Sequence, residues 1–262
     1  MQESVSDLKI LSVDIGGSHV KATILNKEGQ LQMDYERVDT PSPSNPSNLL
    51  ITIKNLAKRL PGYDRVSVGF PGYVKNGVII TAPNLGTDFW KNVDLKKMLE
   101  GELGKPVGVV NDADMQGLGV VSGKGFEMVV TLGTGFGTAV LQDGYLLPHL
   151  ELAHHPIAKK STYDDYIGEK AFVKIGKEKW NKRMKKVLSV LKTVFNYDYL
   201  YIGGGNAKNL NFPLESNMKI ISNKDGIKGG ARLWLKKDST PVITAVNTVN
   251  TAENKLSEAQ KD

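Results

Sequence analysis

The chain has 262 residues, with 34 Lys and Arg against 28 Asp and Glu and a formal net charge of +6. This length suits one large domain or two smaller ones that share a cleft, and the basic balance favours a polyanionic partner without naming one. The absence of cysteine excludes disulfides and thiolate metal sites.

The N-terminus is acidic and polar, which indicates no signal peptide. No apolar run approaches the roughly 20 residues that span a bilayer, so we expect a cytoplasmic protein without a membrane partner.

The first half of the chain predicts a three-stranded meander followed by alternating helices and strands. We expect strands over 8–14, 19–26 and 31–39, a helix over 42–60, a strand over 65–72, an extended segment over 77–84, a helix over 93–103 and a strand over 106–112. These elements predict an N-terminal α/β lobe over residues 1–110.

The second half repeats this order. We expect a strand over 127–135 and its hairpin partner over 136–148 through Asp143-Gly144, helices over about 163–175 and 180–195, strands over 197–206 and 218–223, and a final helix over 226–236. The second long helix carries one apolar stripe that predicts core packing: Trp180, Met184, Val187, Leu188, Leu191 and Phe195.

The predicted C-terminal lobe covers residues 111–235, and its last helix could pack back on the first lobe. Residues 236–262 are polar with weak periodicity, which indicates a loosely held tail or a docking segment.

Three glycine-rich turns each follow an apolar strand: DIGGSHVK at 14–21, TLGTGFGTA at 131–139 and IGGGNAKNL at 202–210. Glycines let successive backbone N–H groups converge on an anion, although tight hairpins also use Gly-Gly pairs. Because the turns are spread over both halves, we predict that they wall one phosphate-binding cleft. The candidate donor-binding residues are Asp14, Gly16, Gly17, Ser18, Lys21, Gly133, Thr134, Gly135, Gly203, Gly204 and Gly205.

Asp14, Ser18 and Lys21 add side-chain chemistry to the first turn. The Ser18 hydroxyl can donate to a phosphate and Lys21 can add positive charge. Asp14 could orient a hydrated Mg²⁺ that the phosphates carry, because magnesium prefers oxygen ligands and keeps water.

The chain resembles the ROK sugar kinases, most closely their polyphosphate glucokinase branch. The motifs DIGGSHVK, PGY, TAPNLG, VVNDAD, TLGTGFGTA, HLELAHH, TYDDY and YIGGGNA follow the family's order over about residues 8–235. This resemblance implies an actin-like, hexokinase-type α/β fold with two similar lobes around a cleft. It also implies phosphorylation of a hexose with ATP or inorganic polyphosphate as donor, and a homodimer.

Asp112 is the predicted general base. The resemblance assigns that role to the aspartate after asparagine in the NDA motif. A carboxylate held at the end of a buried strand is also well placed to take the proton of a hydroxyl aligned with a phosphorus. Asn111 can donate to and accept from sugar hydroxyls, whereas we expect Asp114 to cap a helix that begins near Met115.

Asn84, Glu151 and His154 are further candidate hexose contacts, and all three match sugar-binding positions of the family. An asparagine after proline is also a common turn residue. Glu151 and His154 match the family's E-x-G-H motif with Ala153 in place of glycine, and one Glu–His pair supplies too few ligands for a zinc site. We interpret His155 as structural.

Many ROK proteins carry a cysteine-rich zinc motif that ends in another sugar-binding glutamate. Here the corresponding stretch, PIAKKSTYDDYIGEKA, has no cysteine, so we expect no zinc. Asp165 is the candidate for the missing carboxylate, and the preferred hexose stays open among glucose, mannose and amino sugars.

Eight Lys or Arg and one acid lie between Lys170 and Lys186. Such a run is usually the solvated face of an amphipathic helix, but beside a phosphate cleft it could guide a long polyanion. The turn at 203–205 serves adenosine in ATP-using relatives, so its presence does not settle the donor. We prefer polyphosphate, while ATP, or use of both, stays open.

We therefore predict a glucose 6-hydroxyl kinase that uses polyphosphate, ATP or both, with Mg²⁺. The alternatives are an ATP-dependent ROK kinase for mannose, fructose or an amino sugar, and a non-catalytic sugar-binding ROK protein. About seven residues precede the first strand, too few for the helix-turn-helix of ROK repressors, so we expect no nucleic-acid partner. Hexose binding is expected to draw the lobes together.

Overall fold

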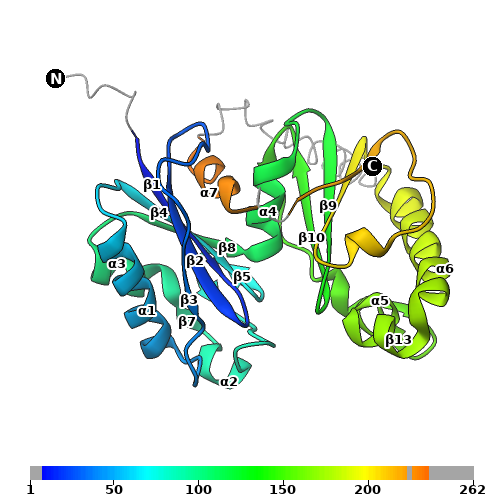
Figure 1. Cartoon of the computed structure of the whole chain (residues 1–262), viewed down its shortest axis with the longest axis horizontal. Coiled ribbons are helices and arrows are strands. Elements are labelled where there is room, and N and C mark those ends of the chain that lie inside the picture. The colour runs from blue at the N-terminus through cyan, green and yellow to red at the C-terminus, as the bar shows by residue number, and fades with distance from the viewer. Residues whose placement is uncertain (1–7, 223–225, 236–262) are drawn as a thin grey trace, which may run out of the picture.

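The computed structural model describes residues 8–222 and 226–235, so the predicted tail over 236–262 lies outside the described residues. Two five-stranded sheets form the two halves of the molecule (Figure 1). The first has the order β3 (Glu36–Asp39), β2 (His19–Leu25), β1 (Ile10–Ile15), β4 (Arg65–Phe70) and β8 (Val107–Asn111). The second has the order β11 (Tyr145–Leu146), β10 (Phe136–Gln142), β9 (Phe126–Leu132), β14 (Tyr199–Gly203) and β15 (Met218–Ile220).

The two sheets share the same strand directions. In the first, β1 pairs antiparallel with β2 and parallel with β4, which pairs parallel with β8. In the second, β9 pairs antiparallel with β10 and parallel with β14, which pairs parallel with β15. Parallel strands end at the same edge of a sheet, where α/β proteins bind their ligands. This directs the ends of β1 and β8, and of β9 and β14, toward common edges.

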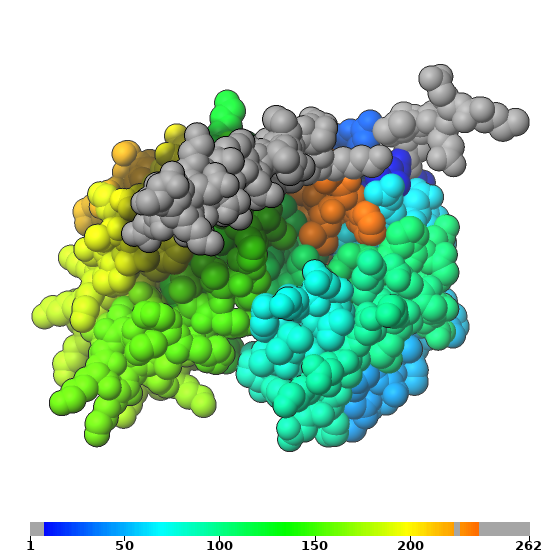
Figure 2. Space-filling model, turned by 180° about the vertical axis from the view of Figure 1, so that it is seen from behind, coloured from blue at the N-terminus to red at the C-terminus, as the bar shows by residue number. Residues whose placement is uncertain are grey.

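Helices cover the outer faces of both sheets and fill the space between them (Figure 1). They are α1 (Pro46–Arg59), α2 (Thr87–Trp90), α3 (Leu95–Leu103), α4 (Asp112–Val120), α5 (Tyr163–Ile167), α6 (Glu169–Phe195) and α7 (Gly229–Arg232). The first core joins α1 and α3 to the first sheet, and the second joins α5 and α6 to the second sheet. Between the sheets, α4 contacts β4, β10 and α7. Seen from behind, the two halves form two masses with a hollow between them (Figure 2).

Short elements complete the fold. A small sheet contains β5 (Val74–Lys75), β6 (Val78–Ile79) and β7 (Val93–Asp94), and a hairpin contains β12 (Pro156–Ala158) and β13 (Ser161–Thr162). Single 3₁₀ turns are η2 (Leu152–His154), η3 (Ala207–Asn209) and η4 (Gly226–Lys228). The predicted hairpin turn at Asp143-Gly144 is confirmed: both residues have positive φ, 50° and 82°, as a two-residue I′ turn requires.

The predicted apolar stripe of the long helix is core, since Trp180, Met184 and Leu191 are fully buried. Where two helices were expected over 163–195, the chain ends α5 at the extended Gly168 and continues α6 to Phe195 with a kink at Gly176. Gly176 has φ 77°, which interrupts the helical hydrogen bonds. None of the described helices has both the length and the apolarity needed to cross a membrane.

Two predicted elements are wrong in extent. The strand expected over 31–39 pairs only from Glu36, preceded by an isolated bridge at Leu31. Leu31, Met33 and Tyr35 are 37–40% exposed, so no packing holds that segment as a strand.

The helix expected over 226–236 is replaced by η4 and the short α7. Gly229 and Gly230 cross the backbone of α4 and β1 so closely that a Cβ would meet the Met115 carbonyl oxygen at 1.8 Å and the Ser12 Oγ at 2.2 Å. This close crossing, rather than helix periodicity, decides the path of the segment.

The C-terminal segment is fastened to the first sheet by buried hydroxyl groups. Ser12 Oγ donates to the Ile227 carbonyl at 2.7 Å and Ser67 Oγ to the Gly230 carbonyl at 2.6 Å, and both serines are fully buried. Arg232 Nη1 donates to the Val121 carbonyl at the end of α4 at 2.9 Å. The chain therefore returns from the second sheet to the first beside the base of the cleft.

Gly229→Ala should lower the free energy of unfolding by roughly 1–3 kcal/mol, because the added methyl group must push α7 away from α4. Gly101→Ala is the matched control: Gly101 lies inside α3 with no atom within 4 Å of an added Cβ, so the same change should stabilise by roughly 0.5–1 kcal/mol. Urea denaturation measures both, and equal effects would contradict the close crossing.

Candidate active site

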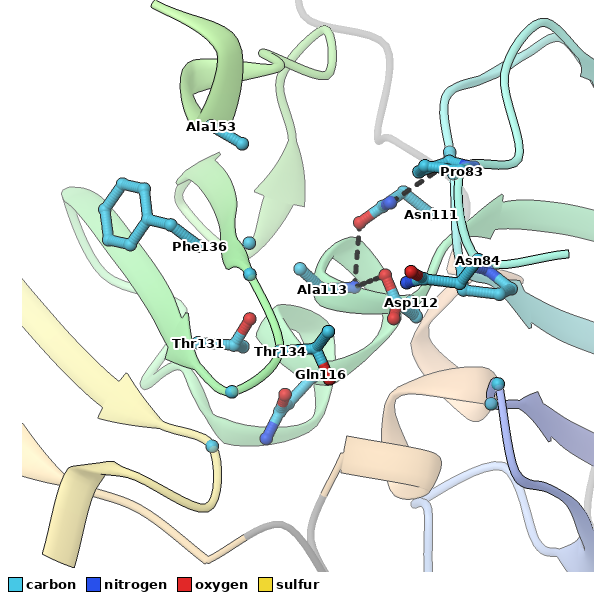
Figure 3. A pocket seen from close by; sticks show the side chains of 18 of the residues that line it. Pro83, Asn84, Asn111, Asp112, Ala113, Gln116, Thr131, Thr134, Phe136 and Ala153 are labelled. Carbon is cyan, nitrogen blue, oxygen red and sulfur yellow. Dashed lines mark hydrogen bonds between the residues drawn. The ribbon is translucent and has the colours of Figure 1, made fainter. Parts of the chain in front are cut away.

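A cavity of about 640 Å³ lies between the two sheets. All three glycine turns contribute to its wall, through Gly16 and Gly17, Gly133 to Gly135, and Gly204 and Gly205. Figure 3 shows Asp112 and Asn84 on one wall, and Thr131, Thr134 and Phe136 on the other. Segments more than 180 residues apart in the chain thus meet at one site.

Most of the predicted site residues line this cavity. They are Asp14, Gly16, Gly17, Lys21, Asn84, Asn111, Asp112, Gly133, Thr134, Gly135, Glu151, His154, Asp165, Gly204 and Gly205. Ser18 and Gly203 are not among the lining residues. Ser18 is exposed at the tip of the β1–β2 hairpin, and Gly203 is the buried last residue of β14.

The glycine turns offer backbone donors to an anion. Gly16 N–H donates to the His19 carbonyl at 2.9 Å and closes the first turn. No hydrogen bond to another described residue uses the backbone N–H of Gly17 or Thr134, and both residues line the cavity. Gly204 has φ +87° and a Cβ there would lie 2.2 Å from the Leu132 carbonyl oxygen, so the third turn requires glycine.

Asn111 caps helix α4, and this cap directs Asp112 into the cavity. Asn111 Oδ1 accepts from Ala113 N–H at 2.8 Å and Asp114 N–H at 3.3 Å, while its Nδ2 donates to the Gly72 carbonyl at 3.0 Å. Of its amide hydrogens, one stays available for a ligand. Asp112 is the first helical residue, and its Oδ1 accepts from Ala113 N–H at 2.9 Å (Figure 3).

The prediction that Asp114 caps this helix is wrong. The helix begins at Asp112 rather than Met115, because Asn111 already accepts from the first backbone N–H groups. Asp114 points into the protein instead, is 8% exposed, and its Oδ2 lies 2.9 Å from His149 Nδ1. Its Oδ1 is buried without a hydrogen-bond partner among the described residues.

Asp112 has the electrostatics of a base at neutral pH. Burial raises the pKa of its carboxyl group from 3.8 to about 7, and the charge of Asp14 contributes in the same direction. The Ala113 N–H acts against this shift, as does the charge of His149. A carboxylate with a pKa near the working pH can take a proton from a substrate and return it to water.

The wall opposite Asn84 carries Glu151 and His154. Glu151 is 32% exposed, and its Oε2 lies 3.9 Å from His154 Nε2. Both lie at the start of or within η2, the single turn that follows the second sheet's hairpin.

Asp164 is a lining residue that the sequence analysis missed. Its Oδ1 accepts from Phe136 N–H at 2.6 Å, burial raises the pKa of its carboxyl group, and its charge interacts with His154 and Glu151. Oδ2 of the neighbouring Asp165 accepts from the Thr162 N–H and hydroxyl at 3.1 and 2.9 Å. The Thr-x-x-Asp spacing of a capping box was a local signal for this assignment.

Gln116 and His149 are two further residues that the sequence analysis did not single out, although His149 opens the HLELAHH motif. Gln116 lies on α4 and lines the cavity beside Gly204 and Gly226. His149 is buried two residues before Glu151, and its side-chain partner Asp114 lies 35 positions away in the chain.

The residues present fit a magnesium ion carried by phosphates. No group of three or more His, Cys, Asp or Glu that could hold a metal occurs in the described part of the chain, so an all-protein cage is absent there. Asp14 lines the cavity, is 36% exposed, and lies 4.0 Å from Lys21 Nζ. One carboxylate beside phosphate-binding turns suits an ion that keeps most of its water.

The chain is similar to proteins of known activity. The ROK family model matches residues 10–150. The polyphosphate glucokinase of Mycobacterium tuberculosis (strain CDC 1551 / Oshkosh) is 30% identical over 240 residues, which cover 84% of this chain and 88% of that protein. The polyphosphate/ATP-glucomannokinase structure from Arthrobacter sp. strain KM aligns with a TM-score of 0.75 and 30% identity, covering 87% and 98% of the two chains.

The fold is shared more widely. A ROK family glucokinase from Streptomyces griseus, solved with glucose and AMPPNP, aligns with a TM-score of 0.71 at 19% identity, over 86% of this chain and 98% of that one. The fold and these relatives define the class: an actin-like, two-lobed phosphotransferase, as predicted. More specifically, the chain belongs to the ROK family.

Asp112→Asn should raise the melting temperature at pH 8. The folded-state pKa of about 7 exceeds the ordinary 3.8, so the ionised carboxylate destabilises the folded state, and this penalty grows as pH rises from about 4 to 7. In a chain of this size, each kcal/mol of unfolding free energy shifts the melting temperature by about 2–4 °C. We therefore expect the melting temperature to rise by several degrees at pH 8 and by less at pH 5.

Asp34→Asn is the control for thermal unfolding, because Asp34 is exposed and lies outside the cavity. It should leave the melting temperature unchanged at both pH values. A loss of stability in Asp112→Asn at pH 8 would contradict the raised pKa of Asp112.

Proposed function

We propose that the protein transfers a phosphoryl group from inorganic polyphosphate, ATP or both to the 6-hydroxyl of glucose, with Asp112 as general base. One observation carries this proposal: Asp112, with its pKa raised to about 7, lies in a cavity to which all three glycine turns contribute. The similarity to polyphosphate glucokinases and to a polyphosphate/ATP-glucomannokinase supports the choice of donor and acceptor.

The reaction needs two partners held in line. The backbone N–H groups of Gly17 and Thr134 bind the donor's terminal phosphate, from the two opposite sheets. The hexose hydroxyl loses its proton to the Asp112 carboxylate as its oxygen bonds to the phosphorus, and the bond to the leaving phosphate oxygen breaks. The shortened polyphosphate or ADP leaves with the electron pair of that bond.

Asp14 would hold magnesium through water, and the ion supplies charge neutralisation on the phosphate oxygens when bound. Lys21, 4.0 Å from Asp14, adds a positive charge to the same side of the cavity. These two residues therefore serve the donor rather than the sugar.

The hexose is held by amide and carboxylate groups around Asp112. Asn84, Glu151 and His154 line the cavity, and Asn111 contributes the amide hydrogen that its capping role leaves over. We assign the third acidic contact to Asp164, whose charge interacts with His154 and Glu151, in place of the exposed Asp165, whose Oδ2 is engaged by Thr162. The homodimer and the closure of the lobes stay predictions.

Asp112→Ala should reduce phosphoryl transfer by about 10²–10⁴-fold, the usual contribution of a positioned general base. The assay is glucose-dependent ADP release or shortening of polyphosphate, with Asp34→Ala as the control that should keep full turnover. Turnover in Asp112→Ala equal to that of the unchanged protein would remove Asp112 from this role.

The cationic residues of α6 support polyphosphate as a donor. Lys170 lines the cavity, Lys174 lies one helical turn beyond it, and Lys177 follows directly after the kink at Gly176; Lys174 and Lys177 are exposed. Arg183 and Lys186 are instead engaged with Tyr166, at 4.4 and 5.8 Å from its ring. Lys174 and Lys177 are thus the exposed cations that follow Lys170 along the chain.

Lys174→Ala/Lys177→Ala should raise KM for long polyphosphate by about fivefold, with a shallower salt dependence, while KM for ATP stays within about twofold. A long polyanion reaches beyond the cavity and a nucleotide does not. Lys58→Ala/Lys105→Ala, which removes two exposed lysines of the first lobe, is the charge-matched control. Equal changes in KM for polyphosphate and ATP, or no change in either, would refute a role of these lysines in binding polyphosphate.

A further inference from the structure

His149 is a buried histidine between the two walls of the cleft. It follows β11, and its side chain is 7% exposed. Nδ1 lies 2.9 Å from Asp114 Oδ2 on the helix that carries Asp112, and Nε2 lies 3.3 Å from Glu151 Oε1. The Tyr73 ring stacks on the imidazole, with centroids 5.8 Å apart and planes at 23°.

The two carboxylates favour the protonated form of His149. When Asp114 and Glu151 are ionised they only accept hydrogen bonds, so both ring nitrogens donate and the ring is an imidazolium. Burial alone would lower the pKa of His149, but the hydrogen bonds that its ring donates to Asp114 and Glu151, together with the charges of these two residues, outweigh burial and raise the pKa to about 9.

We propose that His149 is a positioning residue of the hexose site, which holds the Glu151 carboxylate in place by bridging it to Asp114 on the base-bearing helix. This inference rests on the proposed hexose-kinase function, in which Glu151 contacts the sugar. The bridge takes Oε1 of Glu151 and leaves Oε2, 3.9 Å from His154 Nε2, for the ligand.

The bridge also links the sugar contact to the base. The charged groups around His149 are Asp114 and Asp112 on α4, and Glu151 on its own segment, with His154 and Asp164 beyond Glu151. The positive charge of His149 stabilises the ionised form of Asp112, whereas Asp14 and Asp114 oppose it. Loss of that charge therefore makes Asp112 harder to deprotonate.

His149→Gln tests the proposal, because glutamine keeps one donor and removes the charge. We expect KM for glucose to rise about tenfold with KM for the donor unchanged, since a hydrogen bond to a charged group is lost at the sugar site only. The acid limb of the kcat/KM profile should move to higher pH. His155→Gln is the matched control, as His155 is exposed on the next turn and contacts neither Asp114 nor Glu151.

A double-mutant cycle distinguishes a role of His149 in positioning Glu151 from a general disturbance of the site. If His149 acts through Glu151, His149→Gln should add little to the KM of Glu151→Gln. Independent, multiplying effects on KM, or equal changes in the KM of both substrates, would overturn the proposal. Because His149→Gln leaves Asp114 buried and unpaired, Asp114→Asn/His149→Gln is the companion variant if the single one does not fold.

The ¹⁵N spectrum of histidine in the unchanged protein gives a readout that needs no turnover. The resonances missing from His149→Gln, or from the companion variant, should be those of an imidazolium at pH 7.5 that titrates near pH 9. A neutral ring at pH 7.5 would refute the bridge. Lack of glucose phosphorylation with every donor would instead refute the proposed function, while an imidazolium in the same protein would still support the bridge.

Discussion

The junction between β8 and α4 is the constraint on which the rest of the site depends. Asn111 ends the strand, accepts from the first N–H groups of the helix and donates to Gly72, so three hydrogen bonds fix the turn. Asp112 follows at the first helical position, and its carboxylate is held by backbone geometry rather than by a flexible loop. A carboxylate placed this way needs little reorganisation to accept a proton, as the proposed role of Asp112 requires.

The cleft concentrates acidic groups that would repel one another without compensation. Asp14, Asp112 and Asp114 all have raised pKa values, with burial as the largest cause. Lys21 compensates Asp14, and His149 compensates Asp114. The site is therefore destabilising by itself, and the two apolar cores on its flanks supply the stability that holds it together.

The C-terminal segment ties this arrangement to both lobes. It leaves the second sheet, crosses α4 at Gly229 and is bonded to Ser12 and Ser67 of the first sheet. Helix α4 is therefore held at two places. The Asn111 cap fixes its N-terminal end, where Asp112 lies, and α7 packs against its later residues at Gly229. Movement of the lobes would have to occur around this helix.

The sequence by itself determined the elements whose signals are local: the glycine turns at strand ends, the position of Asp112, the buried stripe of α6 and the family resemblance. Tertiary structure alone decided that Asp114 pairs with His149, that Asp164 accepts from the Phe136 N–H, and that α7 is short. The physical reason is the distance along the chain over which each kind of interaction acts. Periodicity and capping report hydrogen bonds within a few residues, whereas the partner of a buried carboxylate 35 residues away, or the backbone facing Gly229, depends on how the two sheets pack.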